Sequence, residues 1–195
     1  MAGMDEAGRG PLAGPVVAAA VVLPPNHHLA GLDDSKRLSA AARGRLSEAI
    51  AQEALFWAVA DCAPCVIDRL NILRATQQAM RQALAEVCRI ADLAGVLVDG
   101  RPVPDLVCDQ VAVIGGDAKC PSIAAASVLA KVHRDALMLQ LDERYPQYGF
   151  AQHKGYPTPA HLAALHSFGP CAAHRRTFRI KGASLFDHQD ELPSR

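Results

Sequence analysis

The sequence predicts an α/β or α+β protein built around a mixed β-sheet, and three observations carry this prediction. The chain has 195 residues, of which 50% are hydrophobic, enough to bury one substantial core. Short apolar runs rich in valine and alanine have the length and composition of buried strands. Segments with helical propensity follow the first strands and then alternate with later ones, an order typical of sheets flanked by helices.

The first half of the chain contains two strand signals and one helix signal. Residues 16–23 are continuously apolar and stop at Pro24, which predicts a buried strand. Ser39 is expected to cap a helix over residues 40–52, because serine hydroxyls accept hydrogen bonds from the first helical turn. Residues 55–60 combine aromatic and aliphatic side chains, as a further strand does.

The second half alternates helices with short strands. Residues 63–90 have helical propensity, and we expect two helices that meet near Asn71. Residues 96–98 and 111–114 are short apolar runs that predict buried strands. A short helix is expected over residues 157–167.

The strongest helix signal covers residues 122–144 and ends before Pro146. The residues expected on its apolar face are Ile123, Ala126, Leu129, Ala130, His133, Leu137 and Leu141. The tail from Gly182 is expected to be loose. We therefore expect a single domain over residues 1–182, followed by a loose tail over residues 183–195.

Composition excludes several classes of protein. The longest apolar run is far too short to span a bilayer, and the N-terminus lacks the basic start and cleavage site of a signal peptide. The six cysteines are scattered, so they predict reduced thiols rather than a disulfide framework, and Cys62-x-x-Cys65 has no matching second pair for a zinc site. A soluble cytoplasmic protein is expected.

Charge is distributed unevenly along a chain whose net charge is zero. Residues 1–144 contain 14 basic and 17 acidic residues, whereas residues 145–186 contain five basic residues and no Asp or Glu. An acidic centre beside a basic flank suits a metal-dependent enzyme that acts on a polyanion. The alternative is a C-terminal region that is basic without binding anything.

Four carboxylates are expected at strand ends. Asp5 and Glu6 are adjacent near the start of the chain, and Asp99 and Asp117 each follow an apolar run. Because ligands bind beyond the carboxyl ends of strands in such sheets, we expect these residues to share one site. Neighbouring carboxylates repel each other unless a cation lies between them, and Mg²⁺ prefers oxygen ligands. Any one of these aspartates taken alone also fits a turn, as Asp99-Gly100 does.

Glycines flank Arg9 directly after the acidic pair. The spacing of Gly8, Gly10 and Gly14 does not match the dinucleotide-binding fingerprint. Gly8 and Gly10 instead let the backbone approach a ligand, where its polar groups could contact the 2′-hydroxyl that distinguishes RNA from DNA. Arg9 could hold a phosphate, or it could be a solvated arginine in a tight turn.

Further candidate substrate contacts lie in three polar segments. These are Ser35 and Lys36 in one loop, Lys154 and Tyr156 in the segment 153–157, and Arg175 and Arg176 after His174. Cations and hydroxyls can contact the nucleic-acid backbone, and a tyrosine can stack on a sugar or base. The alternative for each is a turn residue or a basic surface.

Several motifs occur in the order found in bacterial ribonuclease HII, and the chain resembles that family from its start to about Phe178. The matching segments are 5–11, 34–36, 71–73, 98–100, 116–117, 125–135 and 153–158. The resemblance implies a ribonuclease H-like fold, with a central mixed five-stranded sheet flanked by helices and a helical C-terminal extension. It also implies that residues 1–182 form one catalytic domain, in which residues 145–182 are a basic substrate-binding part.

The resemblance further implies an endonuclease that cleaves the RNA strand of RNA–DNA hybrids. It implies incision on the 5′ side of single ribonucleotides embedded in duplex DNA, the step that begins ribonucleotide excision repair. Two Mn²⁺ or Mg²⁺ ions would assist hydrolysis and leave 3′-hydroxyl and 5′-phosphate ends. Asp5, Glu6, Asp99 and Asp117 would be the catalytic metal ligands, and the Gly8–Gly10 turn and Tyr156 would sense the 2′-hydroxyl. A monomer is expected.

The chain departs from the family pattern at two positions. Gly115 stands where many relatives have lysine, and His133 replaces a common threonine. The first strand begins so near the start of the chain that we expect its end to be slightly frayed. Three rivals remain: another nuclease of the same superfamily, a catalytically silent hybrid-binding protein, and a metal-dependent phosphatase for small molecules.

Overall fold

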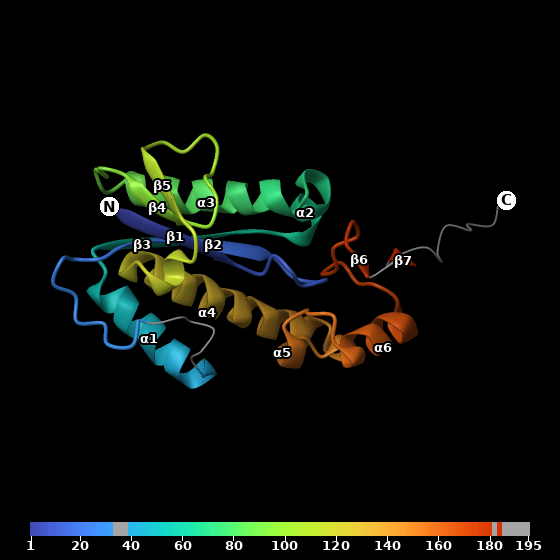
Figure 1. The fold of residues 1–195 in the computed structure, drawn as a ribbon. Coiled ribbons are helices and arrows are strands. Elements are labelled where there is room, and N and C mark those ends of the chain that lie inside the picture. The colour runs from blue at the N-terminus through green and yellow to red at the C-terminus, as the bar shows by residue number, and fades with distance from the viewer. Residues whose placement is uncertain (33–38, 181–182, 185–195) are drawn as a thin grey trace.

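The computed structural model describes residues 1–32, 39–180 and 183–184 of the chain. A five-stranded mixed sheet lies at its centre, in the strand order β3-β2-β1-β4-β5 (Figure 1). The strands are β1 (Ala2–Ala7), β2 (Val16–Val22), β3 (Phe56–Cys62), β4 (Val96–Asp99) and β5 (Gln110–Val113). The first three are antiparallel neighbours, whereas β4 is parallel to both β1 and β5. The expected ribonuclease H-like sheet is confirmed.

Helices cover both faces of this sheet. On one face, α3 (Ile72–Cys88) packs against β2 and β3, with the short α2 (Pro64–Leu70) before it. On the other face, α4 (Pro121–Arg144) lies across β1 and β2, and α1 (Ala40–Glu53) packs beside it (Figure 1). All seven residues of β2 are buried, which explains why its sequence is continuously apolar rather than alternating.

Two helices begin at residues whose side chains cap their first turn. The Ser39 hydroxyl accepts a hydrogen bond from the Ala42 N–H and caps α1, as predicted. Asn71 has a φ of 70° and separates α2 from α3, and its side chain accepts from the Arg74 N–H. Its φ of 70° and ψ of 164° are not helical, so the predicted break near Asn71 is confirmed.

The chain after α4 forms a smaller unit at the far end of that helix (Figure 1). It contains α5 (Phe150–His153), α6 (Pro159–Phe168) and the strand pair β6 (Arg179–Ile180) and β7 (Ala183–Ser184). One-turn 3-10 helices flank α4: η1 (Gly116–Ala118) lies before it and η2 (Pro146–Tyr148) lies after it. Tyr148 and Phe150 stack in a third core cluster, which also contains Leu12 and Met138.

The predicted apolar face of α4 is rotated from the true one at its C-terminal half. His133 is exposed, whereas Arg134 and Met138 are buried. Helical spacing alone places the apolar residues of the sequence on the buried face. The backbone carbonyl groups packed against this helix instead favour burial of the Arg134 guanidinium. The α4 prediction was therefore right in extent and partly wrong in orientation.

The ends of the chain also differ from expectation. The first strand is not frayed, because Ala2 is fully buried and β1 pairs on both sides. Ala183–Ser184 belong to a short strand, and the rest of the predicted tail lies outside the described residues. No helix among the described residues is long and apolar enough to cross a membrane.

Candidate active site

The structure places Asp5 and Asp99 side by side on neighbouring strands. In the parallel pair of β1 and β4, Met4 is level with Val98, so the next residues along each strand, Asp5 and Asp99, are level too. Asp99 is the last residue of β4, as predicted. Asp5 lies inside β1 rather than beyond its end, because the antiparallel pairing with β2 continues to Ala7.

Helix α4 packs closely on the face of β1 that carries Asp5. Side chains alternate along a strand, so Gly3 and Asp5 point to the same face. A Cβ atom on Gly3 would lie only 2.3 Å from the Ser122 backbone of α4. This close approach lets Ser127 on α4 hydrogen-bond to Asp5.

The environment of Asp5 penalises its negative charge. The residue is only 6% exposed, and its Oδ1 accepts a hydrogen bond from the Glu6 N–H at 2.7 Å. The pKa of Asp5 is raised to about 7, first by burial and then by the charge of Glu6, with a smaller contribution from Asp99. Repulsion among these three acids shows that the fold gathers them, and a cation between them would relieve it.

Asp99 connects the strand end to the segment that carries Asp117. The Gly116 N–H donates to Asp99 Oδ1 at 2.7 Å. A Cβ at Gly116 would lie 2.5 Å from an Ile123 side-chain atom and 3.3 Å from Asp99 Oδ1, so glycine permits this approach. Asp117 follows in η1 and therefore lies next to a residue that contacts the site.

Glu6 faces a cavity of about 150 Å³ at the end of β1. Its other lining residues are Ala7, Gly8, Ser127, Lys131, Arg134 and Tyr156. The Tyr156 ring is 46% exposed, and its Cε1 lies 3.7 Å from where a Cβ of Gly10 would be. The glycine turn and the tyrosine, which are far apart in sequence, thus adjoin one cavity beside the acids.

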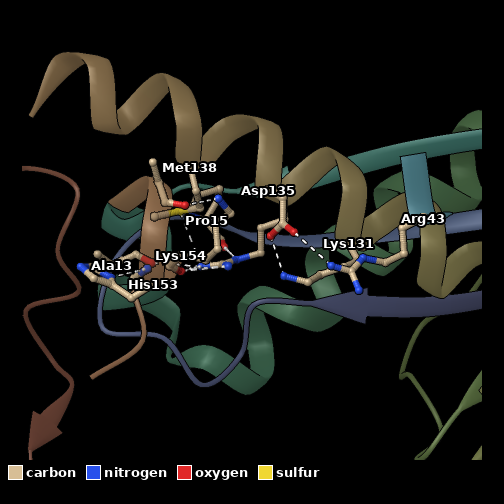
Figure 2. A network of polar contacts seen from close by, with 11 residues as sticks. Ala13, Pro15, Arg43, Lys131, Asp135, Met138, His153 and Lys154 are labelled. Atoms are coloured by element: carbon tan, nitrogen blue, oxygen red, sulfur yellow. Dashed lines mark hydrogen bonds and ion pairs between the residues drawn. The ribbon is translucent and has the colours of Figure 1, made fainter. Parts of the chain in front are cut away.

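Charged partners surround this cavity. Arg9 forms an ion pair with Glu6 at 3.2 Å. Lys131 forms one with Asp135 at 2.6 Å, and Asp135 also faces Arg43 at 4.0 Å (Figure 2). The lining of the cavity itself thus contains the Glu6 carboxylate and two cations, Lys131 and Arg134, which suits a phosphate held near a metal.

The donor set fits a metal ion shared with substrate rather than a closed metal cage. Among the residues that the structure describes, no group of three or more metal-ligating side chains is arranged to hold an ion by itself. Mg²⁺ commonly binds through one or two carboxylates and keeps other positions for water and substrate phosphates. Asp5 and Asp99 supply such carboxylates.

Arg175 is not a substrate contact, contrary to the sequence prediction. Its side chain is fully buried, and among the residues that the structure describes its guanidinium donates only to backbone carbonyl groups. His174 before it is also buried, so two of the three residues expected to form a basic surface belong to the interior. Sequence reasoning assigned them to the surface because basic residues are rarely buried.

The remaining predicted substrate contacts have varied positions. Arg176 is exposed, and its backbone N–H donates to Asp68. The Lys154 ammonium donates to the Ala151 carbonyl at 2.5 Å, and the backbone of Lys154 has a φ of 51°. Ser35 and Lys36 lie outside the described residues.

Three residues of α4 were missed as site residues. Ser127, Lys131 and Arg134 all line the cavity, and their spacing of four and then three residues places them on one helix face. That spacing was visible in the sequence. The neighbouring alanines and valines are typical of a helix packed in the core, so these three residues were not assigned to a site.

Comparison with protein families gives one clear match. The family model for ribonuclease HII matches residues 2–181. Ribonuclease HII of Nitrosococcus oceani is 51% identical over 179 residues, which cover 92% of this chain and 88% of that protein. Ribonuclease HII of Dechloromonas aromatica is 56% identical over 176 residues, which cover 90% and 89%.

Solved structures agree with this match. Ribonuclease H2 from Pyrococcus horikoshii superposes with a TM-score of 0.76 at 26% identity, covering 91% of this chain and 92% of that one. Ribonuclease HII from Archaeoglobus fulgidus, solved in complex with PCNA, gives 0.74 at 27% identity over 94% and 97%. A ribonuclease HIII solved with Mn²⁺ shares the fold at a TM-score of 0.72, at 19% identity over 91% and 66%.

Proposed function

The chain belongs to the ribonuclease HII family, and we propose that its carboxylates Asp5, Glu6, Asp99 and Asp117 perform the cleavage that defines this family. That activity is endonucleolytic hydrolysis of RNA in RNA–DNA hybrids and at single ribonucleotides embedded in duplex DNA. The observation that supports the assignment is the level placement of Asp5 and Asp99 on parallel strands. The raised pKa of Asp5, caused first by burial and then by the charges of Glu6 and Asp99, agrees with it.

Ribonucleases of this family work with divalent metal ions. We assign Mn²⁺ or Mg²⁺ to this chain, held by Asp5 and Asp99 with Glu6 and Asp117 beside them. When bound, two such ions would activate water and neutralise charge on the leaving oxygen.

The substrate is held by elements around the cavity. The Gly8–Gly10 turn and the Tyr156 hydroxyl contact the ribose, because both adjoin the cavity beside Glu6. Arg9 and Arg176 are exposed cations that reach duplex phosphates. Cleavage on the 5′ side of the ribonucleotide then leaves 3′-hydroxyl and 5′-phosphate ends, and the enzyme acts as a monomer.

The proposal is tested with a labelled DNA duplex that contains one ribonucleotide. With Mn²⁺ or Mg²⁺, the chain should cut this strand once, and end analysis should give a 3′-hydroxyl and a 5′-phosphate. Asp5→Asn should abolish cutting but retain duplex binding. An uncut ribonucleotide duplex, or cutting at the parental rate by Asp5→Asn, would contradict the assignment.

A further inference from the structure

Two buried arginines lie beneath the glycine turn. Arg134 is 1% exposed and Arg175 is fully buried. Neither forms an ion pair with a carboxylate in the part of the chain that the structure describes. Burial lowers the pKa of Arg175 to about 9, with a smaller effect from the charge of Arg134, so the group stays cationic at neutral pH. Burying a charge without an opposite charge is expensive unless hydrogen bonds satisfy it.

Backbone carbonyl groups of residues 8–15 accept the hydrogen bonds that the Arg175 guanidinium can donate. This guanidinium donates five hydrogen bonds, with distances from 2.6 to 3.2 Å. The acceptors are the carbonyl oxygens of Gly8, Arg9, Pro11, Gly14 and Pro15. The Phe178 ring packs 5.0 Å from the same guanidinium. One side chain from the C-terminal part thus fixes the path of residues 8–15.

Arg134 connects this segment to the loop that carries Tyr156. Its Nε donates to the Pro15 carbonyl at 3.0 Å, and its Nη2 donates to the carbonyls of Ala13 and Lys154 at 3.1 Å (Figure 2). The two segments also bond directly, because the Leu12 N–H donates to the Gly155 carbonyl at 2.8 Å. The guanidinium therefore lies where the two predicted ribose-sensing segments meet.

The packing at this junction leaves no room for a shift. A Cβ on Gly155 would lie 2.5 Å from the Ala13 carbonyl oxygen, and Gly155 has a φ of 82°. A Cβ on Gly8 would lie 2.0 Å from Arg134 Nε. Both glycines are thus required by the closeness of the segments, and the segments behave as one unit.

The carbonyl bonds to Arg175 also orient the turn's donors. In a trans peptide the C=O and the following N–H point in opposite directions. Because the carbonyls of Gly8 and Arg9 point to Arg175, the N–H groups of Arg9 and Gly10 point away from it. A cation behind each peptide also polarises it and strengthens its N–H as a donor.

We propose that Arg134 and Arg175 are positioning residues that hold the Gly8–Gly10 turn and Tyr156 as one preformed ribose-binding surface. Their guanidinium donors are taken up by backbone carbonyls, so they set the rate of cleavage at a lone ribonucleotide by fixing the groups that contact it. This inference rests on the proposed function, since it assigns a role in the same site.

The test compares cleavage with binding that does not involve a ribose. Single-turnover rates are measured on a duplex with one ribonucleotide, and affinity is measured on the all-DNA duplex without metal. Arg134→Met removes the guanidinium, Arg134→Lys keeps the charge and a single donor nitrogen, and Gly155→Ala separates the two segments while keeping Arg134. Arg144→Met is the matched control, because Arg144 is an exposed arginine of the same helix. Val87→Ala controls for lost stability, since Val87 is buried in the core on the other face of the sheet.

Arg134→Met and Gly155→Ala should slow cleavage about tenfold or more per folded molecule, while affinity for all-DNA duplex stays within about twofold. Arg134→Lys should lie between Arg134→Met and the parent. If Arg134→Met does not fold, the cleavage rates and all-DNA affinities of Arg134→Lys and Gly155→Ala test the inference instead.

Parental cleavage rates in these variants would overturn the inference. So would a joint loss of cleavage rate and DNA affinity that matches the loss in Val87→Ala at the same fall in melting temperature. Failure of the proposed function is distinguishable from both outcomes. In that case the unchanged chain itself would leave the ribonucleotide duplex uncut.

Discussion

Asp5 combines two properties that oppose each other in the metal-free protein. It is buried beside Glu6 and Asp99, so its ionised form is unfavourable, yet only the ionised form is a good metal ligand. Its folded-state pKa of about 7 lies above the ordinary value of 3.8. The folded state therefore binds more protons between these values, and stability declines as pH rises through that window.

Asp5→Asn should stabilise the metal-free protein while abolishing cleavage. An amide keeps the acceptor for the Glu6 N–H but removes the charge, so the gain should be roughly 2 kcal/mol near pH 8 and absent near pH 3.8. Urea unfolding in the presence of a chelator measures it. Asp92→Asn, at an exposed site, should change nothing. A loss of stability in Asp5→Asn at pH 8 would contradict the account of Asp5.

Tyr156→Phe isolates the phenolic hydroxyl at the cavity. The ring and its packing remain, so folding and affinity for all-DNA duplex should be unchanged. Cleavage at a lone ribonucleotide should fall about tenfold if the hydroxyl contacts the ribose. Tyr145→Phe, outside the cavity, should keep the parental rate. Equal rates for the two variants would remove Tyr156 from the sensing surface.

At the scale of elements, α4 shows where sequence patterns are sufficient and where they are not. Its extent follows from apolar periodicity, and its end follows from Pro146. The burial of Arg134 does not, because its acceptors come from residues 13, 15 and 154, which no local pattern places together. Arg175 was misassigned for the same reason.

The positions of the acids were easier to predict than those of the buried arginines, because they depend on where strands end. Asp99 at the end of an apolar run was identifiable, since parallel strands bring their carboxyl ends to one edge. The place of Asp5 within β1 was not, because the strand was expected to end at Asp5, whereas β1 continues to Ala7 before the Gly8–Gly10 turn. What the sequence could not supply was the depth of Asp5, which depends on α4 packing.

Gly3→Ala tests the contact between β1 and α4. The added Cβ would lie 2.3 Å from Ser122 C and 2.4 Å from Ile123 N, both backbone atoms, so the helix must move away. We expect a loss of roughly 2–4 kcal/mol in unfolding free energy and slower cleavage, because Ser127 moves with the helix. Calorimetry and the ribonucleotide assay measure these effects.

Gly44→Ala is the matched control, since Gly44 lies within α1 and a Cβ there meets nothing within 4 Å. It should stabilise the protein by about 0.5–1 kcal/mol, because alanine favours helix interiors over glycine. Similar effects of the two substitutions would mean that β1 and α4 are not closely packed.

At the scale of the whole molecule, the C-terminal part is joined to the sheet through polar networks as well as apolar contacts. Arg175 bonds back to residues 8–15, and Asp68 of α2 accepts hydrogen bonds from Arg176 and Thr177. A third network contains His161 and His174, both buried against Phe150. Global stability therefore depends on the protonation of this part.

The hydrogen bonds assign neutral tautomers to both histidines. The Cys171 N–H donates to His174 Nδ1 at 3.0 Å, so the proton of His174 is on Nε2 and points to His161 Nε2, also 3.0 Å away. His161 then carries its proton on Nδ1 and donates to the Tyr156 carbonyl at 2.9 Å. Protonating His174 would place a donor against the Cys171 N–H and break this chain at its start.

Loss of this hydrogen-bond chain in acid should therefore lower stability over the same pH window in which Asp5 has the opposite effect. Burial, followed by the charge of His161, lowers the pKa of His174 from 6.5 to about 4. The unfolded state binds the extra proton across this window, so stability is present above pH 6.5 and is lost as pH falls toward 4, by roughly 3 kcal/mol. Urea unfolding from about pH 7 to pH 4.5 measures the slope, in the Asp5→Asn background that removes the opposite contribution of Asp5. His174→Gln should lower stability at neutral pH and flatten the slope, whereas His166→Gln, at an exposed site of α6, should leave it unchanged. A parental slope that survives in His174→Gln would place the acid-sensitive group elsewhere, because no other change in that variant removes a titrating imidazole.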